Sequence, residues 1–318
     1  MSAVPLIETV ELKKYFRTSA GPLHAVDGVN IRINRGETLG VVGESGCGKS
    51  TLGRTVLRLL QETGGQVLYD GEDICRYSKA QMKQMRQKMQ IIFQDPYSSL
   101  NPRMSVSEII AEPMVITPGY GRTSQIYERV YKLMETVGLA ERLAYSYPHE
   151  LDGGRRQRIG VARALALSPQ FIVCDEPVSA LDVSIQAQIL NLLMDLQDEM
   201  GLTYMFITHD LSVVKHISDE IAVMYLGQCV ERAKSRELFA SPTHPYTQAL
   251  LGAILKPNLK SRGRIKEVIR GEVTSPINPP PGCRFAPRCP YADDGCVRED
   301  IPLRDIGDSH FVACLREA

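Results

Sequence analysis

The chain has 318 residues, of which 43% are hydrophobic, so it can bury the core of one large domain or of two modest ones. Lysine plus arginine and aspartate plus glutamate both number 37, and this balance argues against a dedicated nucleic-acid-binding protein, which usually has a basic bias. No apolar run approaches the roughly 18 residues of a membrane span, and the N-terminal residues lack a signal-peptide pattern, so we expect a cytosolic chain.

Short apolar strands alternate with amphipathic helices over most of the sequence, which predicts an α/β fold with a mostly parallel sheet core. Helical patterns without a strand predict an inserted helical subdomain at about residues 100–165. After about residue 255 the composition shifts to Lys, Arg, Gly and Pro, so we divide the chain into residues 1–255 and residues 256–318, a linker with a small Cys-rich C-terminal module. The expected strands cover residues 38–42, 171–174 and 203–207, and the expected helices cover residues 50–60 and 185–200.

Residues 43–51 read GESGCGKST and fit the phosphate-binding pattern G-x-x-x-x-G-K-[ST] between a predicted strand and a predicted helix. The glycines allow backbone N–H groups to face phosphate oxygens at the helix N-terminus. We expect Lys49 to reach the β- and γ-phosphates and the Ser50 hydroxyl to bind Mg²⁺. A Gly-rich turn with a solvated lysine is the alternative, and the flanking strand and helix argue against it. The loop consists of Gly43, Glu44, Ser45, Gly46, Cys47, Gly48, Lys49, Ser50 and Thr51.

Polar side chains follow several other apolar segments. In FIVCDEP, Asp175 would hold Mg²⁺ and Glu176 would polarise an attacking water, unless the two carboxylates only cap the next helix. Gln94 in IIFQDP can bind Mg²⁺ or water, or can cap a turn. His209, at the end of another predicted strand, has a structural role as its simplest interpretation.

These motifs together resemble those of one family. In the order GESGCGKST, IIFQDP, LDGGRRQRIGVARAL, FIVCDEP, SALD and ITHD they are similar to the nucleotide-binding domain of ABC transporters, over roughly residues 5–250. The resemblance implies a P-loop domain that binds and hydrolyses ATP with Mg²⁺. It places Gln94 in the Q-loop and makes His209 the switch histidine. It also implies that either Tyr15 or Phe16 stacks on adenine.

The family works as a head-to-tail dimer in which each ATP lies between the phosphate loop of one subunit and the signature motif of the other. Residues 151–155 match the signature motif, so the resemblance assigns Asp152, Gly153 and Gly154 to nucleotide binding. Residues 179–182 match the D-loop, which adds Asp182. The inserted helical region would dock the permease.

A narrower resemblance comes from SPTHPYTQALL at residues 241–251 and from the Cys-rich tail, which are similar to ATPases of oligopeptide, dipeptide and nickel importers. It implies a heterodimer with a paralogous ATPase at the cytoplasmic face of the membrane, two integral-membrane permease subunits and an extracytoplasmic solute-binding protein. Peptide import is the leading hypothesis. Import of nickel or another metal chelate, a soluble non-transport ABC ATPase and an iron–sulfur redox protein are the alternatives.

Four cysteines of the tail, Cys283, Cys289, Cys296 and Cys314, form a possible ligand set for a soft metal centre. Structural zinc usually uses Cys pairs only two to four residues apart, so the wider spacing and the resemblance favour a [4Fe–4S] cluster over Zn²⁺. Four free thiols around a small loop fold are the third interpretation.

The signature motif departs from the usual LSGGQ, because this chain has LDGGR. An ionised Asp152 can only accept hydrogen bonds and would repel the γ-phosphate, although Arg155 and Arg156 follow closely. Asp is also a favoured residue before the first turn of a helix. The sequence leaves both interpretations open: a degenerate ATP site closed by Asp152, or a simple helix cap.

Overall fold

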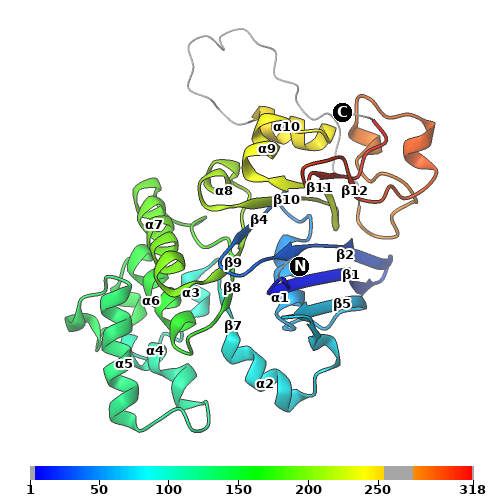
Figure 1. Ribbon diagram of the computed structural model, residues 1–318. Helices are drawn as coiled ribbons and strands as arrows, with labels where there is room; N and C mark the ends of the chain where they lie inside the picture. The colour runs from blue at the N-terminus through cyan, green and yellow to red at the C-terminus, as the bar shows by residue number, and fades with distance from the viewer. Residues whose placement is uncertain (1–3, 254–274, 317–318) are drawn as a thin grey trace, which may run out of the picture. The chain divides into compact units, whose positions relative to one another are not determined.

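The computed structural model describes residues 4–253 and 275–316, and the chain forms two compact units (Figure 1). Unit 1 comprises Met1–Arg76 and Phe206–Ala318, and unit 2 comprises Tyr77–Met205. The boundary falls within strand β9 (Thr203–Ile207). No helix in the described part of the chain is long and apolar enough to cross a membrane. Residues 256–274 of the predicted linker lie outside the described residues.

Unit 1 contains a five-stranded antiparallel sheet that the sequence patterns did not predict. Its strand order is β2-β1-β5-β6, with β3 paired to β1. The register places Tyr15 of β1 opposite His24 of β2. The strands are β1 (Ile7–Thr18), β2 (Gly21–Val29), β3 (Arg32–Ile33), β5 (Gly64–Tyr69) and β6 (Glu72–Asp73).

A second set of strands in unit 1 carries the phosphate-loop sequence. Strand β4 (Thr38–Val42) is buried throughout and pairs in parallel with β10 (Glu220–Tyr225). From β10 the pairing continues antiparallel through β11 (Gln228–Lys234) and β13 (Phe311–Val312) to β12 (Arg304–Asp305). The sheet is therefore mixed rather than mostly parallel. Because the tail adds strands to it and lies within unit 1, a separate Cys-rich module is not confirmed.

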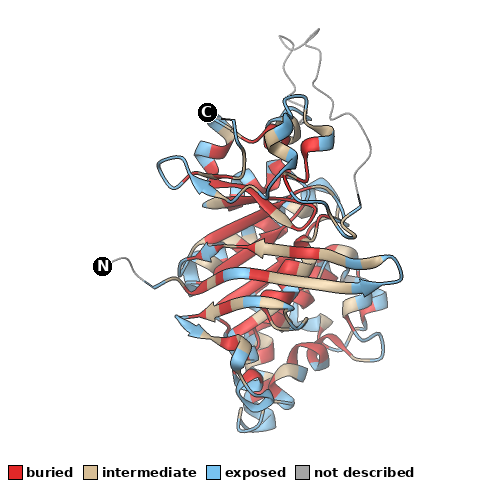
Figure 2. Cartoon of the chain, turned by 90° about the vertical axis from the view of Figure 1, so that its right-hand side faces the viewer, coloured by how far each residue is buried: buried red, intermediate tan, exposed pale blue. Residues whose placement is uncertain are grey.

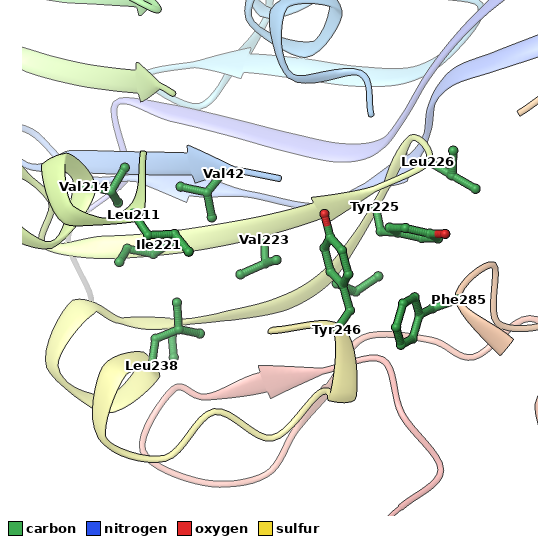
Figure 3. Packing of buried hydrophobic residues seen from close by; sticks show 12 residues of the cluster. Val42, Leu211, Val214, Ile221, Val223, Tyr225, Leu226, Leu238, Tyr246 and Phe285 are labelled. Atoms are coloured by element: carbon green, nitrogen blue, oxygen red, sulfur yellow. The ribbon is translucent and has the colours of Figure 1, made fainter. Parts of the chain in front are cut away.

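The core of unit 1 contains aromatic rings from three distant segments. Tyr225 of β10, Tyr246 and Phe285 pack with ring centroids 4.7 to 5.4 Å apart (Figure 3). All three side chains are almost completely buried. The helices of unit 1 are α1 (Lys49–Val56), α8 (Leu211–Ile217), α9 (Ser235–Ala240) and α10 (Pro245–Ala253), with short 3-10 turns at Ile74–Arg76, Ala286–Arg288 and Asp294–Val297.

Unit 2 combines two parallel strands with most of the helices. Strand β7 (Met89–Ile92) pairs in parallel with β8 (Phe171–Asp175), with Ile92 opposite Cys174. Helices α4, α5 and α6 pack against one another. The helices are α2 (Lys79–Lys88), α3 (Pro96–Ser99), α4 (Val106–Val115), α5 (Thr123–Thr136), α6 (Gly153–Leu165) and α7 (Val183–Met200), with 3-10 turns at Glu141–Leu143 and Pro148–Glu150.

Most predicted elements are confirmed. Strands β4 and β9 have the predicted bounds, and β8 extends one position further, to Asp175. Helix α1 ends earlier than predicted, at Val56. Figure 2 shows continuous runs of buried residues in the interior strands, and β4, β8 and β9 are buried at every position. This burial follows from continuous apolar runs, which are typical of strands covered on both faces.

Candidate functional site

The phosphate loop of unit 1 joins the end of β4 to the start of α1. Gly48 precedes the helix with φ +105°, and a Cβ there would lie 2.0 Å from the Ala25 carbonyl oxygen, so the turn requires glycine. Lys49 is 4% exposed, and its Nζ donates to the carbonyl oxygens of Gly43 (2.8 Å) and Glu44 (2.9 Å). The lysine therefore lies within the curl of the loop, at the N-terminus of α1, where partial positive charge favours anions.

Glu44, the second residue of the loop, has partners that the sequence motifs did not indicate. Its backbone N–H donates to the Tyr246 hydroxyl at 2.9 Å. Its carboxylate accepts two hydrogen bonds from the Arg288 guanidinium, at 2.9 and 3.3 Å. No local pattern links these residues, because Tyr246 and Arg288 follow Glu44 by 202 and 244 positions and meet it only through the fold.

The two candidate adenine-stacking residues have different surroundings in β1. The Tyr15 ring stacks on His24 with ring centroids 3.9 Å apart, and its hydroxyl donates to Asp27. Burial and the Asp27 carboxylate raise the pKa of Tyr15 above its usual range. Phe16 is the next residue of β1, and Lys14 Nζ lies 4.9 Å from its ring centroid. One face of the Tyr15 ring is therefore already covered by His24.

In unit 2 the structure brings Gln94 and Glu176 together. Because β7 and β8 are parallel with Ile92 opposite Cys174, both side chains lie two positions beyond paired residues at the same sheet edge. Gln94 Nε2 donates to Glu176 Oε2 at 2.9 Å. Glu176 has φ +48°, a conformation that costs energy for a residue with a side chain. This amide–carboxylate pair is a suitable group for orienting a water molecule.

Asp175 ends β8 and is 1% exposed. A buried carboxylate is favourable only with a partner such as a cation or a hydrogen-bond donor. Carboxylate, amide and hydroxyl oxygens are the ligands that Mg²⁺ prefers. In unit 2, Asp175 and Gln94 carry such oxygens, and the side-chain oxygen of Gln94 is not used in its bond to Glu176. In unit 1, Ser50 carries a hydroxyl oxygen. The residue types thus fit a magnesium ion.

The signature motif forms the start of helix α6 in unit 2. Asp152 is its N-cap, and its Oδ1 accepts a hydrogen bond from the Arg155 N–H at 2.8 Å. Arg155 Nη1 also lies 3.5 Å from Asp152 Oδ2, whereas Arg156 is buried and donates to the Pro148 carbonyl. A Cβ at Gly154 would lie 2.8 Å from Ile185 Cγ2, so helix packing requires glycine there. Asp152 therefore acts as a helix cap in this structure.

Three other predicted site residues lie at the beginnings of helices. Gly153 is the first residue of α6. Asp182 precedes α7 and is exposed, and its carbonyl oxygen accepts from Gln186 N–H at 2.8 Å. His209 follows β9 in unit 1 and is exposed, next to Asp210, which caps α8.

The four tail cysteines are partly exposed thiols without disulfide bonds. Burial, with smaller contributions from Cys296 and Cys314, raises the pKa of the Cys283 thiol to about 11. The Cys283 N–H donates to the Cys296 carbonyl at 2.7 Å. However, no group of three or more His, Cys, Asp or Glu side chains in residues 4–253 and 275–316 is arranged to hold a metal ion. The predicted [4Fe–4S] cluster and the alternative Zn²⁺ are therefore not supported by this arrangement.

Known proteins resemble the chain over nearly its whole length. The ABC transporter family matches residues 26–179, and the oligopeptide/dipeptide transporter C-terminal region matches residues 230–296. The oligopeptide transport ATP-binding protein AppF of Bacillus subtilis is 50% identical over 97% of this chain and 96% of its own length. OppF of Haemophilus influenzae, another oligopeptide transport ATP-binding protein, is 50% identical over 96% of this chain and 92% of its own length.

Solved structures share the fold. The cbiO1 protein of Clostridium perfringens, part of the ABC transporter complex cbiONQ, has a TM-score of 0.67 at 30% identity, with 74% of this chain and 91% of that chain covered. A dimeric ATP-binding cassette in a post-hydrolysis state, bound to ADP and Pi, has a TM-score of 0.66 at 28% identity, with 72% and 99% covered.

The phosphate loop, the Gln94–Glu176 pair and the shared fold define an ABC-type P-loop ATPase with an α/β fold. The chain belongs to the ATP-binding subunits of ABC transporters, in the oligopeptide/dipeptide transporter family. It is an ATP-binding and ATP-hydrolysing subunit of this class.

Proposed function

We propose that this chain is the ATP-hydrolysing subunit of an importer for di- or oligopeptides. The support is that relatives about 50% identical over nearly the full length are oligopeptide transport ATP-binding proteins, and that residues 230–296 match the oligopeptide/dipeptide transporter C-terminal region. Nickel or chelate import and a non-transport ABC ATPase have no comparable support among these relatives.

The hydrogen bond between Gln94 and Glu176 is the observation that carries the proposed chemistry. In this proposal Glu176 accepts a proton from the attacking water while Gln94 fixes the orientation of the carboxylate. Lys49 and the loop N–H groups bind the phosphates. Asp175, Ser50 and Gln94 are the residues that would hold Mg²⁺, and the ion would supply positive charge to the phosphates. His209 contacts the γ-phosphate side of the nucleotide from the end of β9.

We assign adenine stacking to Phe16. The Tyr15 ring is held in place by stacking on His24 and by the hydrogen bond from its hydroxyl to Asp27. The Phe16 ring instead contacts the flexible Lys14 side chain, which a base can displace. In the assay of ATP affinity, Phe16→Ala then weakens binding, whereas Tyr15→Phe, which keeps the ring, leaves it close to the wild-type value.

The active form in this proposal is a head-to-tail dimer with a paralogous ATPase. Gly153, Gly154 and Asp182 of this chain then contact the nucleotide held by the partner's phosphate loop. The N-terminus of α6 directs N–H groups at the γ-phosphate. Asp152 already accepts a hydrogen bond from the Arg155 N–H, so we assign it the role of N-cap of α6. The competing hypothesis is that Asp152 slows ATP hydrolysis at the site that it closes.

The dimer would act at the cytoplasmic face of the membrane, with two permease subunits and an extracytoplasmic solute-binding protein. The packed helices α4, α5 and α6 form the proposed helical subdomain that docks the permease. The [4Fe–4S] cluster stays a prediction from the sequence and has no part in the proposed chemistry. It requires anaerobically purified protein to be brown and to contain iron, and zinc without iron would contradict it.

Co-purification of the tagged full chain tests the class of function. The proposal expects a paralogous ATPase and two integral-membrane permeases in the purified complex. Ribosomes or DNA without permease would favour a non-transport ABC ATPase, and a redox partner without permease would favour an iron–sulfur redox protein. Either result would contradict the proposed transport function.

A further inference from the structure

Two C-terminal segments of unit 1 contact one residue of the phosphate loop. Tyr246, in the segment THPY, accepts a hydrogen bond from the Glu44 backbone N–H, and Arg288, in the Cys-rich tail, binds the Glu44 carboxylate through two nitrogens. Arg288 also donates to the Tyr225 hydroxyl at 3.3 Å. The same loop residue is therefore held at its backbone and at its side chain.

The charge of Glu44 makes this contact important for a loop that binds an anion. A carboxylate next to the phosphate-binding N–H groups has the same sign as a nucleotide's phosphates and would repel them. The Glu44 side chain is 27% exposed, and the Arg288 side chain is 7% exposed. Because the guanidinium is buried and bidentate, it holds the carboxylate in one orientation and neutralises its charge.

The surroundings of Arg288 fix it in place. The residue ends the 3-10 turn Ala286–Arg288, directly after Phe285. Phe285 packs on Tyr225 and Tyr246 with ring centroids 5.3 and 5.4 Å apart, and Figure 3 shows the three rings side by side. Burial raises the pKa of Tyr246, so its hydroxyl stays protonated and neutral. The turn that carries Arg288 and the tyrosine that holds the loop backbone therefore share one packed aromatic core.

We propose that Arg288 is a positioning residue for nucleotide binding, which neutralises Glu44 and holds its carboxylate away from the phosphates, while Tyr246 fixes the loop backbone. The inference rests on the proposed ATP site at residues 43–51. It gives the C-terminal region, which lies outside the ABC transporter match at residues 26–179, a direct role at the phosphate loop.

The test is equilibrium binding of ATP with Mg²⁺ to the full chain, compared at low and high salt. For Arg288→Gln we expect the Kd for ATP to rise about tenfold, because the carboxylate is left without its counter-charge. Glu44→Gln removes the carboxylate that Arg288 neutralises, so no negative side chain can face the phosphates, and this variant should bind ATP at least as tightly as the wild type. The double variant Glu44→Gln/Arg288→Gln should return to near the wild-type Kd. The loss in Arg288→Gln should shrink as salt is raised.

Arg298→Gln is the matched control, because it removes the same charge from an exposed position of the tail. We expect its Kd to equal that of the wild type. An unchanged Kd for ATP in Arg288→Gln would overturn the proposal. A loss of ATP affinity in Glu44→Gln as large as that in Arg288→Gln would also overturn it, because the ion pair would then only maintain the structure of the loop. If Arg288→Gln does not fold, Glu44→Gln alone still decides by the sign of its effect. Lys49→Ala tests the proposed ATP site separately from the role of Arg288. Wild-type ATP binding by Lys49→Ala would contradict the ATP site itself.

Discussion

Glu231 of β11 joins three parts of the C-terminal region, and its removal should be strongly destabilising. The side chain is completely buried, and its two carboxylate oxygens accept hydrogen bonds from His310 Nε2 (2.7 Å), Thr243 N–H (2.8 Å) and His244 N–H (3.0 Å). Leaving a buried donor without an acceptor costs about 1–3 kcal/mol. Glu231→Ala leaves three such donors without an acceptor, and at the lower end of this range we expect about 3–4 kcal/mol of local destabilisation.

Native-state hydrogen exchange measures this directly, because the Thr243 and His244 amides are two of the donors. A loss of about 3 kcal/mol should make these amides exchange about 100-fold faster under conditions where exchange reports the opening equilibrium. Glu231→Gln keeps one acceptor oxygen and should show an intermediate effect. Glu299→Ala, at an exposed position, is the control. Exchange of the Thr243 and His244 amides at the wild-type rate in Glu231→Ala would refute the argument.

Three further predictions concern the site and its support. Glu176→Gln should keep ATP affinity within a few-fold of the wild type but lower ATP turnover by at least about 100-fold. Lys49→Ala should instead raise the Kd for ATP at least about tenfold. Equal ATP turnover of Glu176→Gln and the wild type would exclude Glu176 as the base. Asp152→Ala should lose about 1 kcal/mol of stability, whereas Asp152→Ser, which can still cap α6, should lose less than about 0.5 kcal/mol. If Asp152→Ser changes ATP turnover per site while stability stays the same, Asp152 has a role beyond capping. Burial lowers the pKa of His244 from 6.5 to about 4. Between pH 7 and pH 5 this histidine therefore binds more protons in the unfolded chain than in the folded chain, and the free energy of unfolding should fall by about 2 kcal/mol. A His244→Asn variant with the same pH dependence of stability would contradict this.

The phosphate loop and the strand ends were predictable because their chemistry is local. The pattern of residues 43–51 needs only a strand before it and a helix after it, and β4 and α1 provide both. Gln94 and Glu176 each follow an apolar run, and parallel pairing places them at one edge. Their direct contact depends on the register of β7 and β8, which no sequence pattern fixes.

The contacts that depend on distant segments could not be predicted. Glu231 lies in β11 beside Arg232, with Lys234 two positions further on, so charge alone does not distinguish it in the sequence. Its three partners lie in two other parts of the chain. Arg288 lies among cysteines that suggested a metal centre, whereas in the structure its contact is with Glu44. The two interpretations of Asp152 were equally compatible with the sequence, and the hydrogen bond from Arg155 N–H favours the helix cap.

Peptide uptake driven by ATP in proteoliposomes tests the central claim most directly. The chain would be reconstituted with its paralogous ATPase and the two permease subunits, with solute-binding protein and labelled peptide on the outside and ATP inside. We expect peptide accumulation that requires ATP hydrolysis and is abolished by Glu176→Gln in this chain. Accumulation that continues at the wild-type rate with Glu176→Gln, or ATP hydrolysis without any peptide uptake by the complete complex, would contradict it.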